Sequence, residues 1–199
     1  MKCSILLTVF FGFVLFGQSN AHACEGYSNY TLEEIKEFRD MLGEADADPL
    51  DRLFALEQMV CSDRPNIRSY AIEQGLKTIQ DPLVRNEVMF KAMMQKTRID
   101  VELGSSRELS DEDKKFIKEN AGVYSNIVTF RSQEHGCISL HRERCSTQYS
   151  VFIVGDKVEL NYNRLSGEFR LSGNGELVGT LRASDRGNYT RIPAVIKLY

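Results

Sequence analysis

The sequence predicts an α+β protein, in which an N-terminal helical bundle or short helical array is followed by a small antiparallel β-barrel or β-sandwich. Two observations carry this prediction. In residues 24–122, apolar side chains recur at helical spacing, and three of the four prolines lie there. In residues 123–199, apolar and polar residues alternate in short runs that glycine-containing turns separate. We therefore expect a helical domain over residues 24–122 and an antiparallel β domain over residues 123–199.

Capping residues mark where the helices of the first part begin. Thr31 and Glu34 have the spacing of a capping box, in which the threonine hydroxyl and the glutamate side chain satisfy amides that have no helical partner. Proline at a first helical position marks further starts. These starts are Asp48-Pro49, Pro65 and Asp81-Pro82. A last helix is expected to begin at Ser110 and to end near Gly122.

One motif occurs twice in the helical part. Asp48-Pro49-Leu50-Asp51-Arg52 returns 33 residues later as Asp81-Pro82-Leu83-Val84-Arg85, and each copy opens a predicted helix. A repeat of this length, with a second helix between the copies, is typical of stacked helical hairpins. Residues 48–103 resemble HEAT-type repeats, in which an Asp-Pro start and a following arginine are common. The resemblance implies a helical array, whereas two generic helix starts in a plain bundle are the alternative.

The second part is predicted to form six or seven strands. In residues 157–162, for example, Val158, Leu160 and Tyr162 share one face while the residues between them are polar. Ser172-Gly173-Asn174-Gly175 is a strong hairpin signal. The segments expected to be strands are 126–130, 137–140, 149–154, 157–162, 168–171, 177–181 and 189–198.

The first 23 residues are predicted to be a secretory signal peptide. Lys2 precedes an apolar run from Ile5 to Phe16, and Ala21-His22-Ala23 provides a cleavage site of small residues. The apolar run is too short to span a bilayer. We therefore expect the protein to be exported to the periplasm or the extracellular space. The alternative is a lipoprotein signal, in which cleavage before Cys24 is accompanied by attachment of a lipid to that cysteine.

Four cysteines remain after the predicted leader, namely Cys24, Cys61, Cys137 and Cys145. An even number of cysteines in an exported chain indicates two disulfides. A bridge between Cys137 and Cys145 closes a short loop and leaves Cys24 to pair with Cys61. A zinc site is less favoured, because no pair has C-x2-C spacing. We expect no metal and no cofactor.

Charge divides the chain at the same place as its secondary structure. Residues 24–122 contain 14 basic and 21 acidic residues, whereas residues 123–199 contain 10 basic and 7 acidic ones. Export and an acidic overall balance argue against a nucleic acid as partner. Several arginines of the β part belong either to a solvated outer face or to an anion site. These are Arg164, Arg170, Arg182, Arg186 and Arg191.

The strongest candidate binding residues lie between Cys137 and Cys145. They are His141, Arg142, Glu143 and Arg144. Guanidinium groups bind carboxylates through two parallel hydrogen bonds, so a rigid loop that carries them suits an acidic protein partner. The sequence therefore predicts a non-catalytic binding protein. One alternative is a secreted hydrolase that uses His135 or His141 with a carboxylate, and another is a carrier that holds a small apolar ligand in the β domain.

Overall fold

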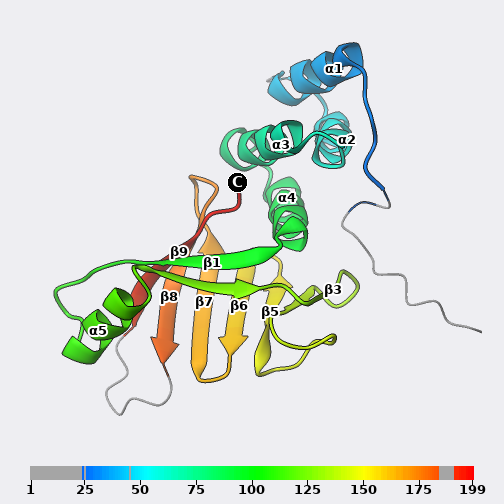
Figure 1. Ribbon diagram of the computed structural model, residues 1–199. Coiled ribbons are helices and arrows are strands. Elements are labelled where there is room, and N and C mark those ends of the chain that lie inside the picture. Colours follow the sequence, from blue (N-terminus) through cyan, green and yellow to red (C-terminus); the bar gives the residue numbers. More distant parts are fainter. Residues whose placement is uncertain (1–23, 25, 45, 184–190) are drawn as a thin grey trace, which may run out of the picture.

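The structure is a computed structural model, and it describes residues 24, 26–44, 46–183 and 191–199. The predicted signal peptide lies outside the described residues, as does Arg186. In the described part, five helices precede or interrupt nine strands, which confirms the α+β class (Figure 1). No helix of this part is both long enough and apolar enough to cross a membrane.

The elements have the following bounds. The helices are α1 (Leu32–Gly43), α2 (Pro49–Val60), α3 (Pro65–Thr78), α4 (Pro82–Gln95) and α5 (Asp111–Glu119). The strands are β1 (Arg98–Leu103), β2 (Val123–Ile127), β3 (Phe130–Ser132), β4 (Cys137–Ser139), β5 (Tyr149–Val154), β6 (Lys157–Tyr162), β7 (Leu165–Leu171), β8 (Leu177–Ala183) and β9 (Ile192–Ile196).

The structure confirms the predicted first residues of the five helices. Thr31 and Glu34 form the complete capping box at α1. Asp48 caps α2 by accepting from the amide of Leu50, and Asp81 caps α4 by accepting from two amides. Ser110 caps α5 in the same way. Local capping chemistry therefore positions four of these five helices, and α3 begins at Pro65 without a side-chain cap.

Helices α1 to α4 form a stack in which each helix packs on the next. Contacts also join α1 with α3 and α2 with α4. The stack buries aliphatic side chains and methionines, among them Leu56, Met59, Leu76, Met89 and Met93. A disulfide between Cys24 and Cys61 ties the N-terminal segment to the end of α2.

All nine strands belong to one antiparallel sheet, in the order β2-β1-β9-β8-β7-β6-β5-β4-β3. The sheet curls strongly, so that β1 and β2 cross in front of β5 to β8 (Figure 1). The ring of Tyr124 on β2 contacts the ring of Tyr162 on β6, with 6.3 Å between centroids, although four strands separate β2 from β6 in the order of the sheet. The curl encloses a core, which includes Ile99, Leu160, Phe169 and Leu181.

The helical stack closes one end of this curled sheet. The β7–β8 turn reaches up beside α4 and below α3 (Figure 1), and there the Arg85 guanidinium donates to the carbonyl of Ser172 at 2.6 Å. At the same turn, the backbone of Gly175 lies against Leu76, so closely that an added Cβ would meet the Leu76 Cβ at 2.7 Å. One continuous group of buried side chains runs from α2–α4 into the sheet.

Two strands differ from the prediction. Residues 98–103 lie in the range assigned to helices, yet they form β1, which pairs with β2 and β9. Residues 126–130 were predicted to be one strand, and they belong to two, because the chain turns a corner at Val128 and Thr129. The Val128 amide donates to the carbonyl of Thr97, whereas the Thr129 amide donates to the carbonyl of Ser139 on β4, at the opposite end of the strand order. The residue pattern changes at residue 122, but the sheet does not begin there. Strand β1 precedes this position and pairs with β2 and β9, which follow it.

Candidate binding site

The four candidate residues His141–Arg144, named here the basic loop, lie between β4 and β5. A disulfide between Cys137 and Cys145 closes the loop at its base, with 6.3 Å between the Cα atoms. The Arg142 amide donates to Ser139 Oγ at 3.3 Å, and Thr129 Oγ1 donates to the Arg142 carbonyl at 2.8 Å. These bonds hold the backbone of the loop in place while its four side chains are exposed.

The basic loop rests on an aromatic ring. The imidazole of His141 lies 4.9 Å from the centroid of the Tyr149 ring, and the guanidinium of Arg142 lies 5.7 Å from the same centroid. A cation near a ring face is attracted by the ring's quadrupole. The described part of the chain gives neither Arg142 nor Arg144 an ion-pair partner. Their charges are therefore open to a carboxylate from outside the chain.

A row of half-buried aromatic rings leads away from the basic loop. It runs from Tyr149 on β5 to Tyr162 on β6, then to Tyr124 on β2 and Phe116 on α5. Neighbouring centroids are 5.6, 6.3 and 6.0 Å apart in that order. Burial raises the pKa of Tyr124. We name these four residues the aromatic row, and it places apolar ring surface directly beside the cations of the basic loop.

Sequence reasoning did not find the aromatic row. Tyr162 could be assigned to the inner face of its strand from alternation alone, but Tyr124 and Tyr149 lie on other strands. Only the curl of the sheet brings β2 over β6. The one signal in the sequence is that each of these tyrosines stands at or near the end of a run of alternating residues.

The hydrolase alternative needs His135 or His141 to act with a carboxylate, and the surroundings of each ring bear on it. His135 lies in the β3–β4 turn, where its Nδ1 is 2.9 Å from Ser132 Oγ. His141 lies beyond the other end of β4, against Tyr149. Both side chains are exposed, and the described residues place no carboxylate in hydrogen-bonding contact with either ring. A general base needs a group that orients it, and neither histidine has a carboxylate in that position.

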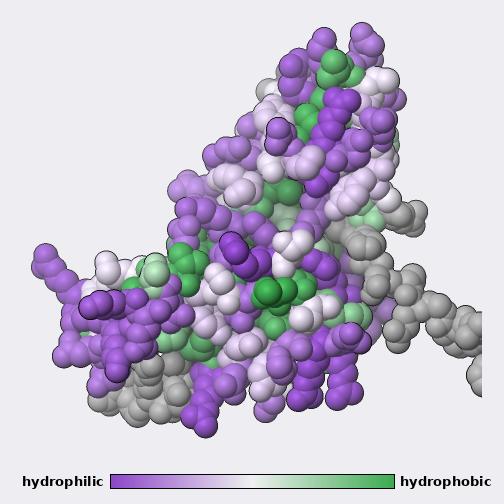
Figure 2. Space-filling model, in the orientation of Figure 1, coloured by the Kyte–Doolittle hydropathy of each residue, from purple (hydrophilic) through white to green (hydrophobic). Residues whose placement is uncertain are grey.

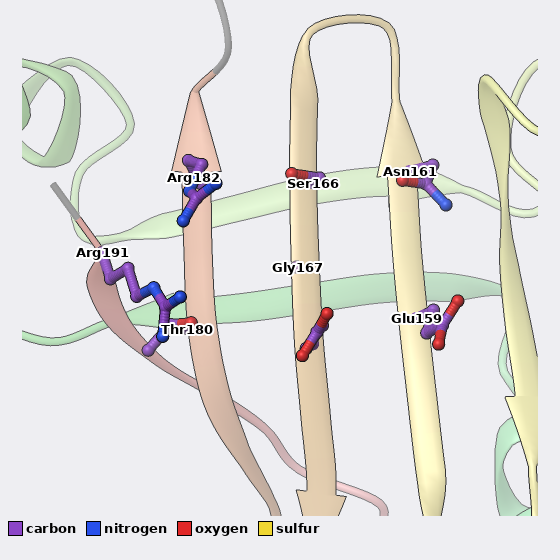
Figure 3. Close-up of a pocket in the computed structure, with 8 residues that line it drawn as sticks. Glu159, Asn161, Ser166, Gly167, Thr180, Arg182 and Arg191 are labelled. Atoms are coloured by element: carbon purple, nitrogen blue, oxygen red, sulfur yellow. The ribbon is translucent and has the colours of Figure 1, made fainter. Parts of the chain in front are cut away.

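The arginines of the β part do not form a single basic face. Arg170 pairs with Asp156 at 2.9 Å, whereas Arg182 and Arg191 line a pocket of about 230 Å³ on the outer face of β6–β8 (Figure 3). Glu159 and Glu168 stand directly opposite each other in the same pocket. The pocket therefore combines both charges, which a simple anion site would not do.

A second polar pocket, of about 410 Å³, lies on the outer face of β1 and β2. Its Lys96 is partly buried, and burial lowers the pKa of that amine. Burial alone would raise the pKa of Asp100, but hydrogen bonds from Ser125 and Arg98 outweigh it and hold that pKa below its ordinary value. Ser125 Oγ donates to Asp100 Oδ1 at 2.5 Å. These groups connect β1 and β2 by side chains as well as by their ladder.

Among the described residues, no group of three or more histidines, cysteines, aspartates and glutamates could hold a metal ion. The four cysteines lie in the two disulfides, in the pairs that the sequence suggested. The chain matches no protein-family model, no curated protein and no solved structure, so that the residues themselves carry any functional argument.

Proposed function

We propose that this chain is an exported, non-catalytic binding protein whose basic loop docks an acidic surface of a partner protein. The observation that carries the proposal is the loop itself. Two guanidinium groups, which have no ion-pair partner among the described residues, project from a backbone that a disulfide and two hydrogen bonds hold in place. A site that is ordered before binding loses little conformational entropy when the partner arrives. Arginine pairs with carboxylates in a geometry that gives specificity as well as affinity.

Export is supported by the two disulfides, which persist in oxidising compartments. The leader of the sequence favours the periplasm as the destination. Cys24 lies in a disulfide with Cys61, and this supports the pairing of that cysteine over its lipidation.

We also propose that α2 to α4 are a short HEAT-type stack, with α1 packed against it as a cap. Three features support this: the Asp-Pro starts of α2 and α4 are 33 residues apart, α3 packs between them, and both motif arginines donate to carbonyls outside their own helices. Arg52 donates to Glu44, and Arg85 donates to Ser172. In this arrangement the curled sheet covers one end of the stack, which has too few repeats to stand alone.

The two alternatives receive less support. A hydrolase would need an oriented base, and the nearest neighbours of His141 are a tyrosine ring and an arginine. A carrier would need an apolar cavity of several hundred Å³ within the sheet. The inward side chains there include Phe169, Leu160 and Leu181, and each is almost wholly buried by its neighbours.

The proposal is tested by charge reversal in the basic loop. The double variant Arg142→Glu/Arg144→Glu should bind a hexaglutamate peptide at least about tenfold more weakly than the native chain, because two charge-assisted pairs are lost. The matched control is Arg39→Glu/Arg107→Glu. It changes the net charge by the same amount at two exposed arginines that lie outside the basic loop. Isothermal titration calorimetry measures both affinities. Equal weakening by the two variants would show that only net charge matters, and the proposal would be wrong.

A further inference from the structure

Strand β2 forms one edge of the sheet, and its outward backbone groups can be identified. The ladder with β1 continues on both sides of β2 through two bonds, from the Val128 amide to the Thr97 carbonyl and from the Leu103 amide to the Gly122 carbonyl. In an antiparallel ladder, bonded and non-bonded pairs alternate. Tyr124 and Asn126 therefore bond to β1.

The residues between them direct their peptide groups away from the sheet. These residues are Val123, Ser125 and Ile127. The Val123 amide is used by the turn that precedes β2, where it donates to the Asn120 carbonyl at 3.0 Å. Ser125 and Ile127 thus offer an N–H and a C=O each, and Val123 offers a C=O.

This edge lacks the features that usually protect an edge strand. Such strands carry charged side chains, proline or a bulge, which prevent further strands from pairing. Strand β2 has the sequence Val-Tyr-Ser-Asn-Ile, with no charge and no proline, and its register with β1 is regular. Ile127 is 69% exposed and Val123 is 40% exposed. In Figure 2, apolar surface lies over the middle of the sheet, where Figure 1 places the end of β2, with hydrophilic residues around it.

The aromatic row lies on the inner side of this edge. Figure 1 shows that β6 to β8 continue past β2 on the side that no described strand covers. The rings of Tyr162 and Tyr149 belong to this continuing surface and are half-buried, as is Leu165 at the start of β7. A chain placed along β2 would therefore gain backbone bonds from the edge and ring contacts from the strands behind it.

The basic loop stands at one end of the same edge. Thr129, two residues after Ile127, holds the Arg142 carbonyl through its hydroxyl. A segment that runs antiparallel to β2 passes Ile127 first, so its N-terminal residues would meet Arg142 and Arg144. Charge complementarity thus requires acidic residues at that end of the segment.

We propose that β2 binds an extended acidic–aromatic peptide segment of the partner protein as a tenth, antiparallel strand, with alternate large apolar side chains on the aromatic row and N-terminal acidic residues on the basic loop. The inference rests on the proposed function and specifies the form of the partner. A single extended segment is the occupant that fits. The edge of a folded second copy would bring its own β5–β8 into the space that β6–β8 already occupy beyond β2 (Figure 1).

The pairing fixes the design of a probe peptide. In the sequence Glu-Asp-Thr-Phe-Thr-Phe-Thr, the central Thr between the two Phe residues stands opposite Ser125, and its amide points at β2. The amide of the Phe that follows points away. Methylation of the central Thr nitrogen should weaken binding to the full chain about tenfold, because it removes one backbone bond and adds a methyl group at the edge. Methylation of the following Phe nitrogen is the matched control and should change the affinity little.

A protein variant tests the same bond from the other side. Ser125→Pro removes an outward amide that the ladder with β1 does not use, whereas Ser125→Ala keeps that amide. Both variants lose the Ser125–Asp100 bond. We expect Ser125→Pro to weaken binding of the probe about tenfold relative to Ser125→Ala, with circular dichroism spectra that match the native chain.

The possible results separate the two proposals. Equal affinities for the two methylated peptides, or no binding of the unmethylated probe, would overturn strand pairing at β2. If charge reversal in the basic loop still weakens hexaglutamate in that case, the proposed function stands without the strand. If the methylated peptides differ while charge reversal has no effect on either peptide, β2 binds the segment and the basic loop does not.

Discussion

At the scale of single residues, Gly179 permits the close approach of β7 and β8. It lies on β8 between Phe169 on one neighbouring strand and Ala194 on the other. A Cβ added there would be only 1.9 Å from the carbonyl oxygen of Glu168, which is backbone and cannot rotate away. The two strands approach this closely because glycine has no side chain. The spacing of β7 and β8 at this point therefore depends on the absence of a side chain at position 179.

We predict that Gly179→Ala destabilises the protein by about 1–3 kcal/mol or more, since the added methyl group forces β7 and β8 apart. The control is Gly173→Ala in the β7–β8 turn, where nothing lies within 4 Å of the added Cβ. Urea unfolding followed by circular dichroism measures both free energies of unfolding. If the two variants had equal free energies of unfolding, a methyl group at position 179 would not clash with β7, and the prediction would be wrong.

Residue chemistry explains which parts of the site the sequence could predict. The capping box at Thr31, the Cys137–Cys145 bridge and the exposed arginines at 142 and 144 depend on residues that are close to each other along the chain, so the sequence contains the information that predicts them. The requirement for glycine at 179 and the contact of Tyr124 with Tyr162 depend on which strands meet. That information lies in the register and curl of the sheet, which alternation does not reveal.

At the scale of elements, the β4–β5 loop combines a tight covalent closure with a functional surface. Cys137 is fully buried on β4, whereas the side chains of the basic loop are exposed. The second disulfide, between Cys24 and Cys61, closes a longer stretch of chain and lies at the helical stack. The two bridges are therefore expected to differ in what their removal changes.

We predict opposite effects of removing the two disulfides. Chain entropy assigns about 2.5 kcal/mol to a loop of eight residues and about 4 kcal/mol to one of 37. Cys24→Ser/Cys61→Ser should cost more stability yet leave the affinity for hexaglutamate unchanged. Cys137→Ser/Cys145→Ser should weaken that affinity several-fold, because the basic loop loses its fixed backbone. Thermal melts and calorimetry check the pair. Equal affinities of the two variants would contradict a role of the bridge in binding.

Elements also show why the strand prediction was incomplete. In β1, Ile99, Val101 and Leu103 alternate with polar residues, so the signal was present. It was assigned to the helical range because the resemblance to HEAT-type repeats was extended to residue 103. The corner at Val128 and Thr129 has no turn residue at all, and only its bonds to two different strands divide β2 from β3. Glycine and proline are the residues from which turns are predicted, so a turn that contains neither is missed in the sequence.

At the scale of the whole molecule, the helical stack and the sheet share one core. Buried residues of α2–α4 continue without a break into the interior of the sheet. The bond from Arg85 to Ser172 and the contact of Leu76 with Gly175 join the two parts at the surface of that core. Neither part could be removed without exposing apolar side chains of the other.

We therefore predict that the protein unfolds in a single cooperative step. Far-ultraviolet circular dichroism reports chiefly the helices, and near-ultraviolet circular dichroism reports the tyrosines and phenylalanines, most of which lie outside α1–α4. The two transitions in urea should coincide, as they do for a two-state unit. Separate midpoints would mean that the helical stack and the sheet unfold as independent domains, as the predicted division at residue 122 implies.

The position of β9 has a consequence for the order in which the molecule assembles. Glu102 on β1 pairs with Val195 on β9, so β1 obtains this neighbour only after all the residues between them have been synthesised. Contacts between such distant positions slow folding, because a large loop must close before they form. The sheet consequently stays divided during synthesis, because β1 and β8 are joined to each other only through β9.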